Sequence, residues 1–141
     1  MLIGIDLTGD TELEEKLNNL SNSIDDMTPV MMRIAGALRY ETMRNFEEEG
    51  RPKWVPISQA RIKQRLARGH WPGKILTDTG QLRSSVSTDY GKDYVVVGTN
   101  KVYAATHQFG RGGIAARPFL PDAEQMRPAI EAILKEHMGQ E

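Results

Sequence analysis

The stretch that most constrains the fold of this chain is residues 75–120, which read ILTDTGQLRSSVSTDYGKDYVVVGTNKVYAATHQFGRGGIAARPFL. Its middle is rich in β-branched and aromatic residues and is interrupted by Gly91-Lys92 and by Gly98-Thr99-Asn100. This composition favours two short antiparallel strands, over residues 82–90 and 93–98, joined by a tight turn. Because a two-stranded ribbon is barely stable alone in water, it needs more strands or helices over its apolar face.

The segments on both sides of this stretch are predicted to be helical. Apolar residues recur every three or four positions over residues 11–25, over residues 28–49 and again after residue 121. Pro29 suits the first turn of the second of these helices, because proline lacks only an N–H group that would have no partner there. In the last helix, Pro128 should cause a kink or a restart.

A shorter basic helix is predicted over residues 59–68. Ser58 is a good N-terminal cap for it, and Gly69 would end it. The sequence does not decide the secondary structure of two further segments. Residues 2–7 alternate weakly and could be an edge strand, and residues 103–109 could be a third strand or a single helical turn.

Together these elements predict an α+β fold, with a small antiparallel sheet built on a central β-ribbon and packed by N-terminal and C-terminal helices. The length of 141 residues fits a single domain. We divide it into an N-terminal strand with acidic helices (1–50), a basic, tryptophan-containing arm with a short helix (51–77), a β core (78–120) and a C-terminal helix (121–141).

The net charge of -1 conceals a strong separation of charge along the chain. Residues 1–50 contain four basic and eleven acidic side chains, whereas residues 51–77 contain seven basic side chains and no acidic one. The rest of the chain is close to balanced. Such polarity bears on the partners that a protein attracts and not on its fold.

Few patterns in the chain point to catalysis or to a cofactor. There is no cysteine, and His70, His107 and His137 lack a second ligand at the spacing of a metal site. The glycines of residues 110–113 lack the Gly-Lys-Ser/Thr order of a phosphate-binding loop. We therefore expect no metal, no cofactor and no enzymatic activity. A hydrolase that uses His107 with a distant acid is the remaining catalytic alternative.

The chain also lacks the marks of membrane insertion or export. Its apolar runs are much shorter than the roughly 20 residues that cross a membrane. Its first ten residues contain no basic region and reach an acid at Asp6, unlike a signal peptide. We expect a soluble protein that stays in the cytoplasm and has no membrane partner.

The basic segment, residues 51–77, has three possible roles. Its cations, flanked by Trp54 and Trp71, could follow a nucleic-acid backbone with aromatic stacking. Against this role, the isoelectric point of the whole chain is near 6.3, whereas independent nucleic-acid-binding domains are usually basic. An ordinary solvated helix and a protein interface are the other two roles, and an interface is favoured over nucleic acid.

Several segments of the chain resemble a known family. PKWVPIS (52–58), ILTDTGQLRSSV (75–86), VGTN (97–100), YAA (103–105), HQFG (107–110) and ARPFL (116–120) occur in this order. This succession resembles the phage virion morphogenesis (tail completion) family of Mu-like and P2-like tailed bacteriophages. The resemblance covers residues 46–120, and glycines, prolines and one tryptophan dominate it.

The resemblance implies a non-enzymatic structural protein of the phage neck or tail end, which completes the tail and joins it to the filled head. Related neck and tail-end proteins commonly form rings, often hexamers, through which DNA passes. The implied partners are further copies of the chain, neck, connector or tail proteins, and non-specifically the passing DNA. The protein would act in the host bacterial cytoplasm during assembly, from an infecting phage or a prophage, and then in the virion.

A ring needs a contact between two different surfaces of the subunit, and an acidic segment followed by a basic one supplies two unlike surfaces. We therefore expect the glutamate-rich end of the second helix to meet the basic segment of a neighbouring copy. Pairing of the two segments within one subunit is the alternative, and a nucleic-acid-binding module that uses residues 51–77 is the second function. The candidate interface or DNA-facing residues are Trp54, Arg61, Lys63, Arg65, Arg68, Glu47, Glu48, Glu49, Tyr103, His107, Phe109, Arg117 and Phe119.

Overall fold

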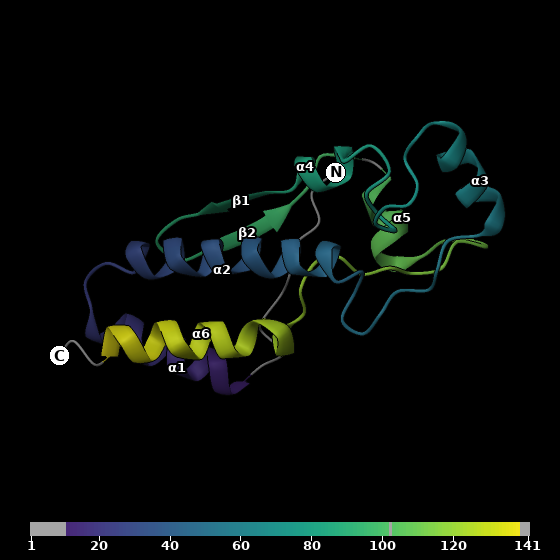
Figure 1. The fold of residues 1–141 in the computed structure, drawn as a ribbon. Helices are drawn as coiled ribbons and strands as arrows, with labels where there is room; N and C mark the ends of the chain where they lie inside the picture. Colours follow the sequence, from purple (N-terminus) through teal and green to yellow (C-terminus); the bar gives the residue numbers. More distant parts are fainter. Residues whose placement is uncertain (1–10, 102, 139–141) are drawn as a thin grey trace.

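The computed structural model describes residues 11–101 and 103–138, the side chains of Thr11 and Met138 excepted (Figure 1). The edge strand predicted at residues 2–7 lies outside this range. The described elements, in order, are helices α1 (Thr11–Ser23), α2 (Thr28–Glu47), α3 (Gln59–Ala67) and α4 (Gln81–Ser85), strands β1 (Ser87–Tyr90) and β2 (Val95–Gly98), and helices α5 (Ala104–Phe109) and α6 (Ala123–Met138).

Helix α2 is the central element of the fold. It lies between the β-ribbon on one side and helices α1 and α6 on the other (Figure 1). Strands β1 and β2 are antiparallel, with Ser87 opposite Gly98 and Tyr90 opposite Val95. The α+β fold with a β-ribbon packed by N-terminal and C-terminal helices is therefore confirmed.

Buried apolar side chains on α2 and α6 support this layering. The buried residues Val30, Ile34 and Leu38 recur at helical spacing, and the equally buried Met126 and Ile130 belong to α6. Fully burying a side chain of this kind stabilises the fold by about 1.5–3 kcal/mol. The sequence pattern that predicted the helices is thus the pattern that packs them.

The ends of the helices largely follow the local signals. Helix α2 starts at Thr28 with Pro29 in its first turn, and the Ser58 hydroxyl caps α3 by accepting a hydrogen bond from the Arg61 backbone N–H at 3.2 Å. Gly69, with a φ of +75°, lies just beyond the end of α3. Helix α6 continues through Pro128 and does not restart there.

The strand predicted over residues 82–90 is wrong in its first half. Residues 81–85 form α4, and only residues 87–90 are a strand. Gly80, at a φ of +82°, precedes this helix. The helix buries Leu82, and Val86 just after the helix is buried too. Residues 103–109, for which strand and helical turn were both open, form α5.

An aromatic cluster fastens the Pro-rich segment to the end of α2. The Phe46 ring centroid is 6.2 Å from that of Trp54, edge to face, and 5.3 Å from that of Phe119. The Trp54 indole N–H donates to the Pro118 carbonyl at 2.9 Å. Gly50 is required beside this cluster, because its φ is +94° and an added Cβ would lie 2.5 Å from the Trp54 ring.

Candidate assembly interface

The basic arm, residues 51–77, carries α3 away from the body of the fold. In Figure 1, α3 stands at one end of the molecule, far from α1 and α6. Arg61, Lys63 and Arg68 are exposed on it. Within the part of the chain that the structure describes, Arg61 and Lys63 have no acidic partner, and Arg61 donates only to the Gln64 side chain at 3.2 Å.

Arg65, on the same helix, is only 5 % exposed and holds the arm together. Its guanidinium donates to the Lys74 carbonyl at 2.9 Å and to the Ile75 carbonyl at 2.5 Å, and it lies 5.9 Å from the centre of the Trp71 ring. Burial lowers the pKa of Arg65, and the nearby Asp78 opposes that shift. Arg65 is therefore a structural cation and not a free surface charge.

Asp78 contacts several basic side chains at the base of the arm. Its carboxylate accepts from Arg68 at 2.8 Å and lies 2.9 Å from the His70 ring Nδ1. Partial burial alone would raise the pKa of Asp78, but the hydrogen bonds from His70 and Arg68 and the charges of the arginines lower it overall. The carboxylate thus neutralises part of the positive charge of the arm.

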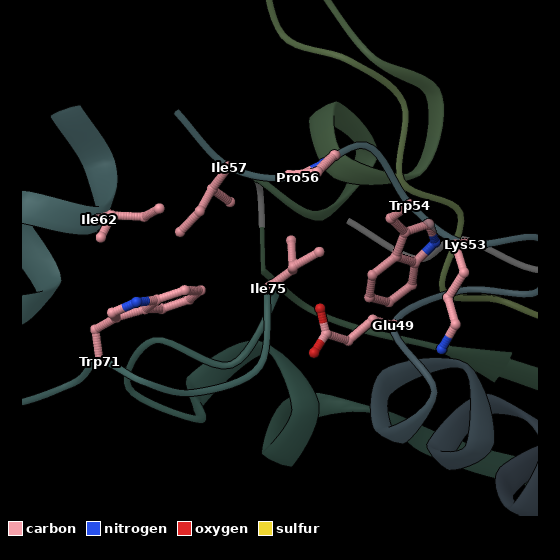
Figure 2. A pocket seen from close by; sticks show the side chains of 8 residues that line it. All are labelled: Glu49, Lys53, Trp54, Pro56, Ile57, Ile62, Trp71 and Ile75. Carbon is pink, nitrogen blue, oxygen red and sulfur yellow. The ribbon is translucent and has the colours of Figure 1, made fainter. Parts of the chain in front are cut away.

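One side of the arm encloses an apolar hollow of about 340 Å³. Figure 2 shows Ile57, Ile62 and Ile75 around it, with Trp71 at one end and the Glu49 carboxylate at the other. Glu49 is half-buried there. This hollow joins the arm to the end of α2, so its apolar lining serves the fold of the arm.

A larger hollow, which we call the groove, has a volume of about 660 Å³. It lies between the arm, the segment before α4, helix α5 and the loop that follows α5. Cationic side chains and exposed apolar side chains both line it. The cations are Arg61, Arg65 and Arg117, and the exposed apolar side chains include Val55, Tyr103 and Ile114. The His107 ring also lines the groove.

Arg117 and His107 are fixed within the groove. Arg117 donates to the carbonyl groups of Val55 at 2.7 Å and Pro56 at 3.0 Å. Burial lowers the pKa of His107, and the charges of Arg117, Arg61 and Arg65 lower it further. The buried Nδ1 atom of His107 has no hydrogen-bond partner among the described residues. The groove is therefore an electropositive site.

The glutamates that end α2 are mostly engaged within the subunit. Glu47 pairs with Arg83 at 2.5 Å and Glu48 with Arg44 at 2.9 Å. The acidic and basic segments also meet in one direct ion pair over the described ranges, Glu41 with Arg51 at 2.7 Å. The acidic surface that the sequence predicted at the end of α2 is thus largely neutralised by the chain itself.

Of the thirteen candidate residues, Glu47, Glu48 and Glu49 lie at the end of α2, and the other ten form three groups, with Arg65 in two of them. Arg61, Arg65, Tyr103, His107 and Arg117 meet in the groove, while Lys63, Arg68 and Phe109, the last 68 % exposed, lie outside it. The third group requires a correction. Trp54, Phe119 and Arg65 are covered by the chain itself and support the fold, because each is less than one tenth exposed.

Sequence reasoning overlooked a second surface at the opposite end of the molecule. The hairpin tip, residues 89–94 (DYGKDY), exposes Asp89, Tyr90, Asp93 and Tyr94 around one lysine. In Figure 1 this turn and the α1–α2 connection both lie at the end away from α3. The alternation of aspartate and tyrosine around a turn was the signal that could have revealed it.

Comparison with known proteins identifies the family. The model of the phage virion morphogenesis family matches residues 8–139. The chain belongs to this family. The resemblance seen over residues 46–120 is therefore confirmed, and it extends over nearly the whole chain, including the N-terminal and C-terminal helices.

Relatives in the family come from a Mu-like prophage and from phage Mu. The chain is 36% identical over 126 residues to Mu-like prophage FluMu G protein 2 of Haemophilus influenzae, covering 84% of this chain and 83% of that protein. It is 33% identical over 133 residues to FluMu G protein 1, covering 91% and 90%. It is 37% identical over 99 residues to the putative capsid assembly protein G of Escherichia phage Mu, covering 62% and 64%. No solved structure matches the chain.

Two further features of the described residues bear on partners. No described helix has the length and apolar character needed to span a membrane. In the same residues, acidic and histidine side chains do not gather in threes as metal ligands would. Among the surfaces of the described residues, the groove, the exposed side of α3 and the hairpin tip combine charged side chains with exposed apolar or aromatic ones.

Proposed function

We propose that this protein is a structural component of the phage virion that completes the tail and joins it to the head, and that it acts as a ring of identical copies. Membership of the virion morphogenesis family supports a role in assembly. One structural observation supports the ring: the two ends of the subunit carry unlike surfaces, a basic groove and an acidic hairpin tip. A ring is built from such heterologous contacts.

In this role the chain performs no chemical step. It acts by binding further copies of itself and proteins of the neck, connector or tail, first in the host cytoplasm and then in the virion. Nucleic acid is the second candidate partner, because Arg61 and Lys63 on α3 and Arg68 just after it are all exposed. Phosphate contacts by these side chains would weaken steeply with salt.

Deletion of the gene from its phage or prophage, followed by electron microscopy, tests the function. Because joining is the step assigned to the protein, we expect DNA-filled heads and separate tails to accumulate, and a plasmid copy of the gene to restore complete particles. The name of the phage Mu relative points to capsid assembly for that protein. Absent or misshapen heads would favour such a role here and contradict tail completion, as would a normal yield of tailed particles.

A further inference from the structure

We infer that the hairpin tip of one copy docks in the groove of the next copy. The inference rests on the proposed assembly of identical subunits, and it assigns the two surfaces that meet. The hairpin tip supplies carboxylates and tyrosines, and the groove supplies arginines and exposed apolar side chains.

The positions of the two surfaces exclude a contact within one subunit. The turn between β1 and β2 lies beside the first turns of α2, whereas α3 and α5, which line much of the groove, lie beyond its last turn (Figure 1). Helix α2 has 20 residues, which corresponds to a length of about 30 Å. A contact between these surfaces must therefore join two copies, head to tail.

The charges of the two surfaces are complementary. The groove contains Arg61, Arg65 and Arg117, which Asp78 offsets only in part. At the hairpin tip, Asp89 and Asp93 outnumber the single lysine. Opposite potentials of this kind guide association and fix the register of a contact.

The region around the hairpin tip adds to its negative charge. The turn between α1 and α2 exposes Asp25 and Asp26. Asp26 is close enough to Lys92 of the tip for the lysine charge to contribute to the lowered pKa of its carboxyl, after the hydrogen bonds from Thr28. The acidic surface thus comes from two segments that lie side by side, and Lys92 does not cancel it.

The apolar parts of the two surfaces also match. Tyr90 and Tyr94 are exposed on the tip, and Val55 and Ile114 are about half exposed at the groove. The groove volume of about 660 Å³ is within the range of pockets that enclose a ligand. Tyrosine and arginine are the side chains that most often dominate the energy of a protein interface.

The hydrogen bonds in the groove indicate which cation meets the incoming carboxylate. Arg65 and Arg117 donate to backbone carbonyls of their own chain. Among the described residues, the Arg61 guanidinium has only the Gln64 amide oxygen as a hydrogen-bond partner. Asp93, in turn, makes no side-chain hydrogen bond or ion pair within the described residues. We therefore assign Arg61 and Asp93 as the pair that forms between copies.

Charge exchange between Arg61 and Asp93 tests this contact. Sedimentation velocity of the full chain should show that Arg61→Glu and Asp93→Arg each raise the dissociation constant of self-association by about tenfold or more, because like charges then face each other. The double variant should regain most of the affinity. A mixture of the two single variants should also assemble, since each groove then meets a tip of opposite charge in alternating order.

Lys63→Glu is the matched control, because Lys63 is exposed on the same helix but outside the groove. It should leave assembly unchanged. Arg61 and Asp93 are both exposed, so thermal unfolding should confirm that the variants fold like the wild type.

Each contrary outcome has a distinct meaning. A wild-type chain that is monomeric at every concentration would overturn both the ring and this contact. An oligomer that Arg61→Glu and Asp93→Arg leave unchanged would overturn the contact alone. Loss of binding to a DNA duplex by Arg61→Glu and Lys63→Glu alike, with assembly intact, would assign the arm to nucleic acid and overturn the contact as well.

Discussion

His107 should make the stability of this protein depend on pH below about 6.5. Burial and three neighbouring arginines lower the pKa of His107 in the folded state below the ordinary value of 6.5. Between the lowered and the ordinary pKa, the unfolded chain binds more protons than the folded chain. The free energy of unfolding therefore falls as the pH drops through that window.

We expect the urea midpoint of the wild type to fall as the pH drops below about 6.5, because the unfolded chain then takes up a proton at His107 that the folded chain does not bind. His107→Gln cannot take up this proton, so its midpoint should fall less over the same range. Fluorescence-monitored urea unfolding at a series of pH values measures both. Parallel pH profiles for the two proteins would show that His107 is not the responsible group.

The neighbours of His107 also show what a sequence can and cannot reveal about single residues. The basic segment was recognised as a surface because its cations are adjacent in sequence. Whether a given cation faces solvent was not predictable, because Arg65 is buried by carbonyls and a tryptophan that come later in the chain. Trp54 and Phe119 are similar cases, since each lies in a Pro-rich segment but packs on Phe46.

Truncation of Arg65 should detach helix α3 from the body of the fold while the rest of the protein stays folded. The two carbonyl bonds of Arg65 tie α3 to residues 74–75, and a hydrogen bond to a charged group contributes roughly 1.5–3 kcal/mol. Hydrogen–deuterium exchange of Arg65→Ala should therefore be at least about tenfold faster within residues 59–75 and little changed in α2 and α6. Arg61→Ala, at an exposed position of α3, is the control.

Faster exchange throughout Arg65→Ala, including α2, would instead show that the arm and the body unfold as one unit.

The difference between local signals and tertiary contacts explains which elements the sequence could predict. Helices α2 and α3 have local start signals, Pro29 and Ser58, and were predicted. The five-residue α4 has no side-chain cap and depends on burial of Leu82 against the core, so its short sequence was read as a strand.

The distribution of charge over the molecule differs from the distribution along the sequence. By sequence, the acidic segment is residues 1–50, and the glutamate-rich end of α2 was expected to meet the basic segment of a neighbouring copy. In the fold, Arg83 and Arg44 neutralise Glu47 and Glu48. Two exposed acids that form no ion pair within the described residues, Asp89 and Asp93, lie at the hairpin tip, which belongs to a segment that is nearly balanced by sequence. Only the tertiary arrangement could show this, because it decides which charges are neighbours.

Because the two ends carry opposite charge, self-association should weaken as salt is added. The Debye length falls from about 10 Å at 0.1 M to about 3 Å at 1 M ionic strength, which screens exposed charges. We expect the dissociation constant from sedimentation velocity to rise by about tenfold over this range. The tyrosines and apolar side chains of the contact should preserve weak association at high salt, because salt does not screen apolar burial.

The variant Arg61→Ala/Asp93→Ala distinguishes the contribution of this pair to the salt dependence of self-association from the contribution of the overall charge of the protein. Removing both charges avoids like-charge repulsion but also removes the attraction that salt screens. Its affinity at low salt should therefore be lower than that of the wild type, and its dependence on salt should be shallower. A salt dependence equal to that of the wild type would place the attraction in other charges, such as Asp25 and Arg117, and the hairpin tip would then dock in a different register.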